Sequence, residues 1–389
     1  MSLEFAYYSL ADLVKIKYGK NQKKVQDDDN GKYPIFGTGG LMGFSKEYLY
    51  DKPSVLIGRK GSIEKVRYVD EPFWTVDTLF YTEVNENIVI PKFLYYMMYL
   101  MDLSRYNEGT SIPSLRTETL NRLEFPVPPL EYQNKVLSIL NNIDKKIELN
   151  NEINHNLINI SKSIFRQKFL NYEGYEDFKD TDYGRIPSTF DVFTLNEISK
   201  EIVCGKTPST KVEDNYGDKM PFITIPDMHN NVFIIETERK LSEKGIQSQK
   251  KKTLPKNSIC VSCIATAGLV SLTYEESQTN QQINSIICKD NISPYFMYLY
   301  LNELSEYIKM LGSGGSTTLN LNKNEFSKIK VAIPNNGDMN KFNDLIEPIF
   351  NKIKFNQLEI IELTKLRDTL LPKLMNGEIN VSKINCDLD

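Results

Sequence analysis

PLEYQNKVLSILNNIDKKIELNNEINHNLINISKSIFRQKFL, residues 129–170, is the stretch that decides the fold. After its first residue it contains neither glycine nor proline, and apolar residues return every three or four positions. Proline is tolerated in the first turn of a helix, so Pro128 and Pro129 are suited to its start. The stretch is therefore predicted to form one long helix, about 60 Å in length at 1.5 Å per residue.

The same pattern occurs a second time near the end of the chain. At a constant offset of 206 residues, 109–169 aligns with 315–375. Pro128 then matches Pro334, and the apolar positions of the helix follow in step. A self-match of this length indicates two copies of one unit, each a globular segment that leads into a long helix.

Apolar residues spaced four and three apart define a heptad seam in each predicted helix. The seam positions of the first helix are Val136, Leu140, Ile143, Ile147, Asn150, Asn154, Leu157, Ser161 and Ile164. Those of the second helix are Phe342, Ile346, Ile349, Ile353, Asn356, Ile360, Leu363, Arg367 and Leu370. An isolated helix would expose its seam to water, so the two helices are predicted to pair with each other.

Asn150 and Asn356 occupy the middle of the two seams. If the helices run antiparallel about a pseudo-two-fold axis, the two midpoints meet in one layer. A buried asparagine opposite another fixes the register of a coiled coil at a cost in stability. We therefore hypothesise that Asn150 and Asn356 face each other. The alternative is a chance coincidence in an asparagine-rich chain.

Short β-type runs and Gly/Pro turns fill the segments before each helix. The expected fold class is α+β: two α/β domains separated by two long helices that form an antiparallel coiled coil, as a pseudo-two-fold internal repeat. The expected boundaries are a domain at 1–128, a helix at 129–170, an acidic linker at 171–189, a domain at 190–336, a helix at 337–379 and a tail at 380–389.

Composition limits the class of protein. The 389 residues include 47 Lys and Arg against 51 Asp and Glu, which is not the basic balance typical of nucleic-acid-binding domains. The longest apolar run, 93–101, is too short to cross a bilayer, and no secretory signal opens the chain. Five cysteines, an odd number, fit a reducing compartment. A cytoplasmic protein with no membrane contact is expected.

Catalytic motifs are missing from the sequence. It contains neither the Asn-Pro-Pro or Asp-Pro-Pro of an amino-methyltransferase nor a Gly-x-x-x-x-Gly-Lys phosphate loop. Of its two histidines, His155 and His229, His155 lies beside seam position Asn154 and is interpreted as a surface or interfacial residue, not as a ligand. Cys260 and Cys263 have the spacing of a zinc or redox pair, but no second pair accompanies them. Their setting resembles a strand, which favours buried structural thiols.

Several motifs, in this order, resemble the specificity (S) subunits of type I restriction-modification enzymes. They are YPIFGTGG at 33–40, IGRKGS at 57–62, PVPPLEYQ at 126–133, GRIP at 184–187, GKTPST at 205–210 and LLPKLMNGE at 370–378. The chain departs from the family at Phe190, where tryptophan is common, and at Tyr132, where glutamate is common. The resemblance covers nearly the whole chain.

The resemblance implies a non-catalytic subunit. Each globular domain would be a target recognition domain that reads one half of a split, non-palindromic sequence in double-stranded DNA. The helices would act as a spacer and dock two methyltransferase (M) subunits, which restriction (R) subunits join. No cofactor is expected on this chain: S-adenosylmethionine would bind to the M subunits, and ATP and Mg would bind to the R subunits. The alternative is a coiled-coil protein-interaction scaffold without nucleic acid.

DNA contact requires local positive charge and donors for base edges. Glycines beside Arg59 would allow close approach to a duplex, and glutamine can pair with adenine. The candidates in the first domain are Lys20, Lys23, Lys24, Thr38, Arg59, Lys60 and Lys65. Those in the second domain are Lys206, Thr207, Ser209, Thr210, Lys211, Lys250, Lys251, Gln281, Gln282, Ser313 and Ser316, with Gln278 as a further glutamine.

Each candidate has an alternative interpretation. Most of the lysines could be ordinary solvated surface residues, and the glycine-rich segment 312–316 could be a flexible loop. Trp74, Tyr95 and Tyr96 are assigned to the core and not to base stacking. Because the net charge is slightly negative, weak DNA binding by the isolated chain is expected, with tight, salt-sensitive binding only in a complex.

Overall fold

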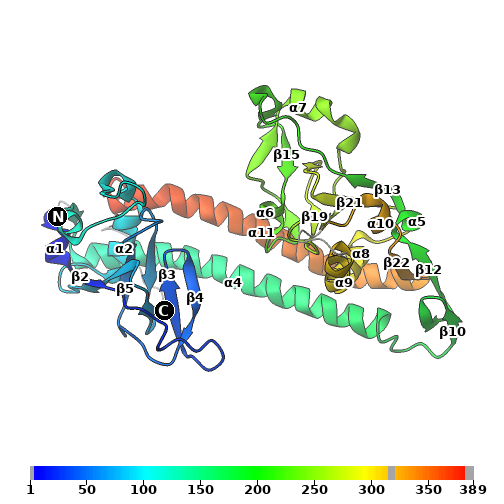
Figure 1. The fold of residues 1–389 in the computed structure, drawn as a ribbon, viewed down its shortest axis with the longest axis horizontal. Coiled ribbons are helices and arrows are strands. Elements are labelled where there is room, and N and C mark those ends of the chain that lie inside the picture. The colour runs from blue at the N-terminus through cyan, green and yellow to red at the C-terminus, as the bar shows by residue number, and fades with distance from the viewer. Residues whose placement is uncertain (1–3, 314–319, 382–389) are drawn as a thin grey trace. The chain divides into compact units, whose positions relative to one another are not determined.

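The computed structural model describes residues 4–313 and 320–381. The chain forms two compact units: unit 1 combines residues 1–146 with 363–389, and unit 2 comprises residues 147–362. Two 40-residue helices, α4 (Leu130–Phe169) and α11 (Asn336–Met375), each contribute one section to either unit (Figure 1). Each unit is thus an α/β domain with a section of both helices.

Unit 1 contains two small sheets and a separate strand pair. The first sheet is antiparallel, with the order β2 (Val14–Tyr18), β8 (Leu79–Val84), β5 (Ser54–Gly58) and β6 (Val66–Val69). The second has the order β4 (Gly40–Ser45), β3 (Tyr33–Gly37) and β7 (Trp74–Thr75). The remaining elements are the pair β1 (Ala6–Ser9) and β9 (Glu124–Val127), and the helices α1 (Leu10–Leu13), α2 (Pro91–Tyr99), η1 (Leu103–Tyr106) and α3 (Thr117–Asn121).

Unit 2 contains two larger sheets and two strand pairs. The first sheet has the order β13 (Ser199–Cys204), β21 (Ile283–Cys288), β18 (Ile259–Ser262), β19 (Val270–Thr273) and β16 (Phe233–Ile234). The second has the order β14 (Tyr216–Gly217), β17 (Arg239–Leu241), β15 (Met220–Ile223) and β20 (Gln278–Thr279). The pairs are β10 (Phe178–Thr181) with β11 (Gly184–Pro187) and β12 (Phe190–Thr194) with β22 (Lys330–Pro334).

The helical segments of unit 2, apart from α4 and α11, are short. They are α5 (Leu195–Ile198), η2 (Glu213–Asn215), α6 (Ile225–Met228), α7 (Glu243–Ser248), η3 (Lys250–Lys252), α8 (Pro294–Glu303), α9 (Ser305–Gly312) and α10 (Lys323–Ser327).

The two units repeat the same pattern of strand pairing. The antiparallel order β2-β8-β5-β6 in unit 1 corresponds to β13-β21-β18-β19 in unit 2. The parallel pair β3-β7 corresponds to β15-β20, and the antiparallel pair β1-β9 corresponds to β12-β22. The predicted internal repeat of two α/β domains is therefore confirmed, and it includes strands of every sheet in unit 1.

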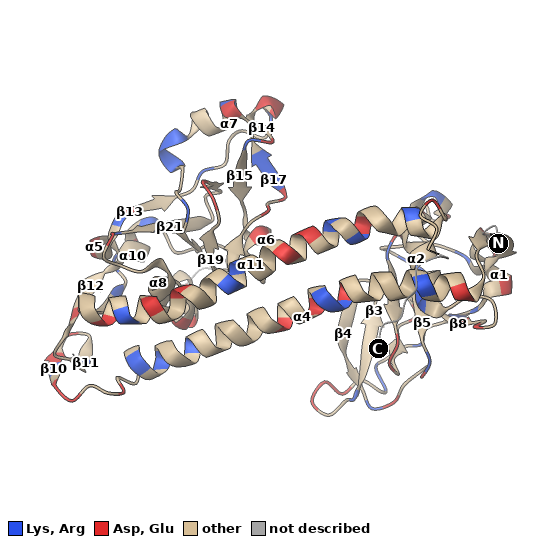
Figure 2. Ribbon diagram, turned by 180° about the vertical axis from the view of Figure 1, so that it is seen from behind, with Lys and Arg blue, Asp and Glu red and all other residues tan. Residues whose placement is uncertain are grey.

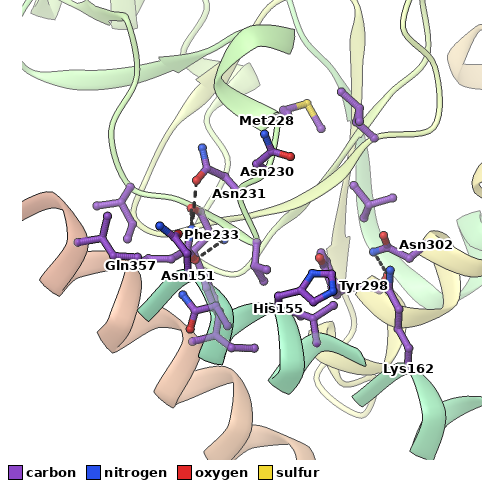
Figure 3. A pocket seen from close by; sticks show the side chains of 18 of the residues that line it. Asn151, His155, Lys162, Met228, Asn230, Asn231, Phe233, Tyr298, Asn302 and Gln357 are labelled. Atoms are coloured by element: carbon purple, nitrogen blue, oxygen red, sulfur yellow. Dashed lines mark hydrogen bonds between the residues drawn. The ribbon is translucent and has the colours of Figure 1, made fainter. Parts of the chain in front are cut away.

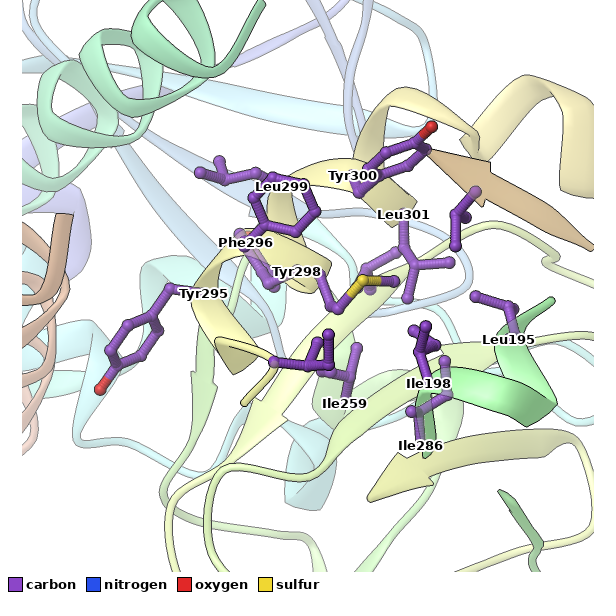
Figure 4. Packing of buried hydrophobic residues seen from close by; sticks show 14 of the residues in the cluster. Leu195, Ile198, Ile259, Ile286, Tyr295, Phe296, Tyr298, Leu299, Tyr300 and Leu301 are labelled. Atoms are coloured by element: carbon purple, nitrogen blue, oxygen red, sulfur yellow. The ribbon is translucent and has the colours of Figure 1, made fainter. Parts of the chain in front are cut away.

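The core of unit 2 is rich in aromatic rings. α8 lies on one face of the five-stranded sheet and packs Phe296 and its neighbours toward Ile259 and Ile286 (Figure 4). Phe165 and Phe169, at the end of α4, contact the Phe296 ring with centroid distances of 5.2 and 5.0 Å. Burying one such side chain stabilises a fold by about 1.5–3 kcal/mol. The end of α4 is thereby anchored in this core.

The core of unit 1 is closed by the end of α11. Leu371 and Leu374 are 2 % and 1 % exposed and pack in the same cluster as Phe93 of α2. The hydroxyl of Tyr132, at the start of α4, lies 3.0 Å from the carbonyl oxygen of Leu374 and 3.0 Å from that of Ile379, and donates to them. The last turns of α11 therefore belong to the first domain.

The two long helices pair in antiparallel fashion within each unit. In unit 1, Asp144 of α4 accepts from the Arg367 guanidinium of α11 at 3.2 Å. In unit 2, Phe165 of α4 contacts Phe342 of α11 with a centroid distance of 6.1 Å. Every seam position of both helices is buried or half-buried. The predicted antiparallel coiled coil is confirmed, and Arg367 is accommodated in its seam by Asp144 and the neighbouring Asp368.

Asn150 and Asn356 are buried, with exposed fractions of 1 % and 0 %. Their hydrogen-bond partners differ from those we hypothesised. The Asn150 amide donates to Glu359 at 2.8 Å, and the Asn356 amide donates to Asn154 at 2.9 Å. The side-chain oxygen of Asn356 is buried and accepts no hydrogen bond from the described residues. Each asparagine side chain therefore forms a hydrogen bond to the other helix. Its partner lies about one helical turn away from the asparagine that we expected it to face.

Candidate nucleic-acid interface

A Gly-Lys dipeptide follows the first sheet strand of each unit. In unit 1, the Gly19 N–H donates to the Leu79 carbonyl at 3.0 Å, and the Lys20 N–H donates to the Thr75 carbonyl at 2.8 Å. These bonds fix the turn and leave the Lys20 side chain exposed. The Trp74 indole N–H donates to the Lys20 carbonyl at 2.9 Å and supports the turn from the buried side.

Unit 2 repeats the two backbone hydrogen bonds of this turn. The Gly205 N–H donates to the Ile283 carbonyl at 3.1 Å, and the Lys206 N–H donates to the Thr279 carbonyl at 2.9 Å. Lys206 is exposed, as Lys20 is. We refer to Gly19–Lys20 and Gly205–Lys206 as the Gly-Lys turns.

Both glycines are required by the close approach of another backbone segment. A Cβ atom at Gly19 would lie 2.0 Å from the Val76 carbonyl oxygen. A Cβ atom at Gly205 would lie 2.1 Å from the Asn280 carbonyl oxygen. Real Cβ atoms do not approach backbone oxygens so closely, so any other residue would displace the turn. The lysine of each turn is therefore held at a fixed place beside the next loop.

In unit 1 several predicted site residues gather around this turn. The Arg59 guanidinium lies over the Tyr18 ring, 5.1 Å from its centroid, and donates to the Asp77 carbonyl at 2.8 Å. The Arg59 and Lys60 N–H groups both donate to the Thr78 carbonyl. Arg59 and Lys60 follow β5, and Lys20 follows β2 in the same sheet. The structure thus brings Arg59 and Lys60 to the same end of this sheet as Lys20.

The remaining candidates of unit 1 lie on the surrounding loops. Thr38 borders the same loop, because a Cβ atom at Gly61 would lie 3.9 Å from its hydroxyl oxygen. Lys23, Lys24 and Lys65 are exposed, and no hydrogen bond or ion pair among residues 4–313 and 320–381 links them with Arg59. They remain candidates on charge and exposure alone.

In unit 2 the turn at 280–282 carries amide side chains. The Thr207 hydroxyl donates to the side-chain oxygen of Gln281 at 2.5 Å. The Asn280 amide donates to the side-chain oxygen of Gln282 at 3.0 Å. Both glutamines remain at least partly exposed. Lys206, Thr207, Gln281 and Gln282 are therefore brought together as one group.

Other candidates of unit 2 lie further away from this group. Ser209, Thr210 and Lys211 are exposed on the loop after Lys206. Lys250 and Lys251 belong to η3, which follows α7 in the chain; Figure 2 shows Lys and Arg in blue. The Ser313 hydroxyl donates to the Met310 carbonyl at the end of α9, and Ser316 lies outside the described residues.

Gln278 is not available for base contact. Its side chain is 0 % exposed, and its amide donates to the Ile246 carbonyl at 3.2 Å and to the Thr253 hydroxyl at 2.9 Å. It also accepts from the Gln249 amide at 2.8 Å. The sequence-based assignment of Gln278 as an adenine reader is therefore wrong. The hydrogen bonds of Gln278 instead link β20 to the residues on either side of η3.

The exposed lysines of the Gly-Lys turns are not neutralised by neighbouring carboxylates. Within the described part of the chain, neither Lys20 nor Lys206 forms an ion pair, whereas Lys244 pairs with Asp214 at 3.1 Å. An unpaired ammonium group at the surface keeps its full charge for an anionic ligand, and a DNA phosphate is such a ligand.

Among residues 4–313 and 320–381, no group of three or more His, Cys, Asp or Glu side chains is placed to hold a metal ion. Cys260 lies in β18, Cys263 follows it, and both are buried, so the expected strand and burial are confirmed. Burial raises the pKa of Cys260 to about 12 and that of Cys263 to about 11. His155 and His229 are both exposed.

A polar cleft of about 720 Å³ lies in unit 2 where β16 meets α4 and α11. Its lining includes Asn151, His155 and Lys162 of α4 with Asn231 and Gln357, and Asn151 lies near Phe233 and Gln357 (Figure 3). The Gln357 side chain accepts from the Phe233 N–H at 3.1 Å and donates to Asn231 at 3.2 Å. These bonds attach β16 of the domain to α11.

The chain contains two copies of one α/β domain, and each copy has a Gly-Lys turn beside a partly exposed polar loop. This arrangement defines a class of protein in which two similar binding domains are joined by paired helices. The family model for the type I restriction modification DNA specificity domain matches residues 3–159 and 187–365. The chain therefore belongs to the type I restriction-modification specificity subunit family.

Named relatives and a solved structure agree with this assignment. The HindI specificity subunit of Haemophilus influenzae is 35 % identical over 364 residues, covering 76 % of this chain and 79 % of the relative. The MjaIX specificity subunit of Methanocaldococcus jannaschii is 26 % identical, covering 86 % and 80 %. The crystal structure of an S subunit from M. genitalium shares the fold, with a TM-score of 0.62, 20 % identity and 96 % coverage of both chains.

Within residues 4–313 and 320–381, no helix has an apolar stretch long enough to cross a lipid bilayer.

Proposed function

We propose that this chain is the DNA sequence-recognition subunit of a type I restriction-modification enzyme. Each domain reads one half of a bipartite, non-palindromic site in double-stranded DNA. The observation that carries the proposal is the repetition of one backbone frame with unlike exposed side chains. Because both domains have the same backbone arrangement, they are suited to the same kind of ligand. Because the exposed side chains at equivalent positions differ, the two domains are suited to different half-site sequences.

The paired helices set the spacing between the two half-sites and dock two methyltransferase (M) subunits, which restriction (R) subunits join. Apolar side chains on α4 support a docking role. Leu149, Ile153 and Ile160 are 43 %, 40 % and 50 % exposed, although they belong to a helix whose seam is already covered by α11. Exposed apolar groups that share a helix surface are typical of protein-protein contacts.

The chain itself carries out no catalysis in this proposal. S-adenosylmethionine binds to the M subunits, and ATP and Mg bind to the R subunits. The net charge of −4 fits a subunit that contacts DNA together with partners that wrap the same duplex. The isolated chain then binds DNA weakly, and the assembled complex binds it tightly and in a salt-dependent manner.

Methylation mapping tests the proposal directly. The chain is co-expressed with type I methyltransferase subunits from its source genome, and methylated adenines are mapped in the host genome with and without the chain. A single bipartite motif that appears only with the chain is the expected result. A protein-interaction scaffold without nucleic acid would leave the genome unmethylated, and that outcome would refute DNA recognition.

Seven residues inserted into each helix test the spacer role. One heptad preserves the seam, so both helices remain paired. The number of unspecified bases between the half-sites is expected to change while both half-site sequences stay the same. A changed base preference within a half-site would contradict the spacer role.

A further inference from the structure

A three-residue turn whose second and third residues are exposed or partly exposed occupies the same place in both units. It joins β7 to β8 at residues 76–78 in unit 1 and β20 to β21 at residues 280–282 in unit 2, an offset of 204. The hydrogen bonds at its ends agree: Val76 N–H donates to the Phe36 carbonyl at 3.0 Å, and Asn280 N–H donates to the Ile223 carbonyl at 3.0 Å. We call residues 76–78 and 280–282 the readout turns.

A second pair of equivalent residues lies beside the readout turns. The Arg59 N–H donates to the Thr78 carbonyl at 2.9 Å, and the Cys263 N–H donates to the Gln282 carbonyl at 2.8 Å. Arg59 and Cys263 also accept from Leu115 and Leu321, at 3.0 and 2.9 Å. Arg59 and Cys263 are therefore equivalent positions, although the aligned sequences give no hint of it.

The side chains at these equivalent positions differ in chemistry. Unit 1 has Val-Asp-Thr in its readout turn with Arg59 alongside, and unit 2 has Asn-Gln-Gln with a buried cysteine. The second and third residues of each turn are exposed or partly exposed. The backbone thus presents two different sets of hydrogen-bonding groups from one geometry.

The groups are held in place before any ligand binds. In unit 2, Thr207 and Asn280 each donate to one glutamine, which leaves both glutamine amide N–H₂ groups directed elsewhere. In unit 1, the Asp77 carbonyl and the Tyr18 ring hold the Arg59 guanidinium. Rotamers that are fixed beforehand lose less entropy on binding, so such groups discriminate between ligands more strongly.

The Gly-Lys turns lie directly beside the readout turns and do not differ between the units. Lys20 bonds to Thr75, the last residue of β7, and Lys206 bonds to Thr279, the last residue of β20. A contact that is identical in two domains with unlike targets carries no sequence information. Contacts to phosphate have this property, and they fix the position of a protein on the duplex.

From the proposed function we infer that the Gly-Lys turns are constant phosphate anchors and that the readout turns, with Arg59 in unit 1, determine the bases read. Lys20 and Lys206 contact the DNA backbone and place the readout turn at the base edges. The guanidinium of Arg59 recognises a guanine in the half-site of unit 1. The amides of Gln281 and Gln282 recognise an adenine in the half-site of unit 2, because glutamine and arginine pair bidentately with these bases.

The test uses the chain assembled with its methyltransferase subunits and duplexes that carry the mapped motif, randomised in one half-site at a time. Arg59→Gln and the pair Gln281→Ala with Gln282→Ala probe the readout. Lys20→Ala and Lys206→Ala probe the anchors. Lys52→Ala, an exposed lysine of unit 1 outside both turns, is the matched control.

The readout variants are expected to reduce discrimination at one base of their own half-site by roughly 5- to 150-fold and to leave the other half-site unchanged. Each anchor variant is expected to weaken binding to every sequence by one common factor. It should also reduce the slope of log affinity against log salt by about 0.9. Lys52→Ala should change neither quantity.

Two results would overturn the inference: an anchor variant that alters base preference, or readout variants that keep the original preference of their half-site. Thr78→Val, which replaces the hydroxyl of this partly exposed residue by a methyl group, gives a second readout variant if Arg59→Gln does not fold. Failure of the proposed function is recognised separately, because the unmodified complex would then show no bipartite motif at all.

Discussion

Unit 1 and unit 2 share a backbone frame but differ in how the frame is extended. Ile35 corresponds to Phe222, an offset of 187, because Ile35 pairs with Trp74 and Phe222 pairs with Gln278. Ile57 corresponds to Val261, an offset of 204. Almost all additional residues of unit 2 therefore lie between β15 and β18, where β16, β17, α7 and η3 are found. The frame is constant, and variation is confined to one insertion and to the exposed turns.

The ends of the two long helices offer the strongest test of this comparison. Phe165 and Leu371 are equivalent at the 206-residue offset, and each closes the core of one unit. We expect Phe165→Ala to lower the stability of unit 2 by about 3–5 kcal/mol and Leu371→Ala to lower that of unit 1 by about 2–5 kcal/mol. Hydrogen exchange followed along the chain would locate each loss. Equal loosening of both units by either variant would contradict the division into two cores.

The glycines of the Gly-Lys turns give the next largest effect. Alanine at Gly19 or Gly205 would place a Cβ atom about 2 Å from a carbonyl oxygen, so we expect a loss of about 1–3 kcal/mol in the affected unit. Each variant should also lose recognition of the half-site that its own unit reads. Gly39→Ala is the control, because a Cβ atom there meets no atom within 4 Å. Thermal unfolding and binding would compare the three variants, and a Gly19→Ala chain as stable as Gly39→Ala would contradict the close approach.

A smaller, stabilising effect is expected in the helix pair. The buried side-chain oxygen of Asn356 lacks a donor, so Asn356→Leu should raise the stability of unit 2 by about 1 kcal/mol. The partner Asn154 is half-buried and can bond to water instead. Denaturant unfolding would measure the gain, with the exposed Asn351→Leu as a control. A loss of stability would show that the Asn356–Asn154 bond contributes more than its desolvation costs.

The smallest expected effect concerns a capping interaction that both units share. Asp12 accepts from the Ser9 N–H at 2.9 Å at the start of α1, and Glu197 accepts from the Thr194 N–H at 2.7 Å at the start of α5. Hydrogen bonds lower the pKa of both carboxyl groups, from ordinary values of 3.8 and 4.5.

A lowered pKa means that each carboxylate stabilises the fold above its ordinary pKa and ceases to do so as the pH falls through its lowered pKa. Asp12→Asn and Glu197→Gln should therefore be slightly less stable than the unmodified chain at pH 7. The difference should disappear in acid. Unfolding measured at both pH values would check this, and a difference that persists in acid would contradict the assignment.

The helices, their seam and the duplication were predictable because they depend on periodicity along the chain. The spacing of Val136, Leu140 and Ile143 is set by the geometry of a helix, whatever surrounds it. The burial of Trp74 and Tyr96 also followed from residue type, with exposed fractions of 8 % and 4 %. Features of this kind can be predicted without knowledge of the tertiary structure.

The equivalence of the Gly-Lys turns could not be found in the same way. Gly19 and Gly205 are 186 residues apart, while the helices repeat at 206, so an alignment at constant offset places neither turn on the other. The equivalence appears only in hydrogen bonds between distant strands. Gln278 was assigned wrongly for a related reason, because its neighbours Gln281 and Gln282 are exposed while its own position lies inside a strand.

The chain order of unit 1 has a consequence for its biosynthesis. The cluster that holds Leu10 and Phe93 is completed by Leu371, Leu374, Met375 and Val381. The ribosome synthesises these four core residues only after all of unit 2. Domains generally fold as they emerge from the ribosome, so unit 1 cannot complete its core at that stage. The first domain to be translated is thus the second to be finished. Until then its nascent core stays open, and a chaperone that shields apolar surface would have its natural target there.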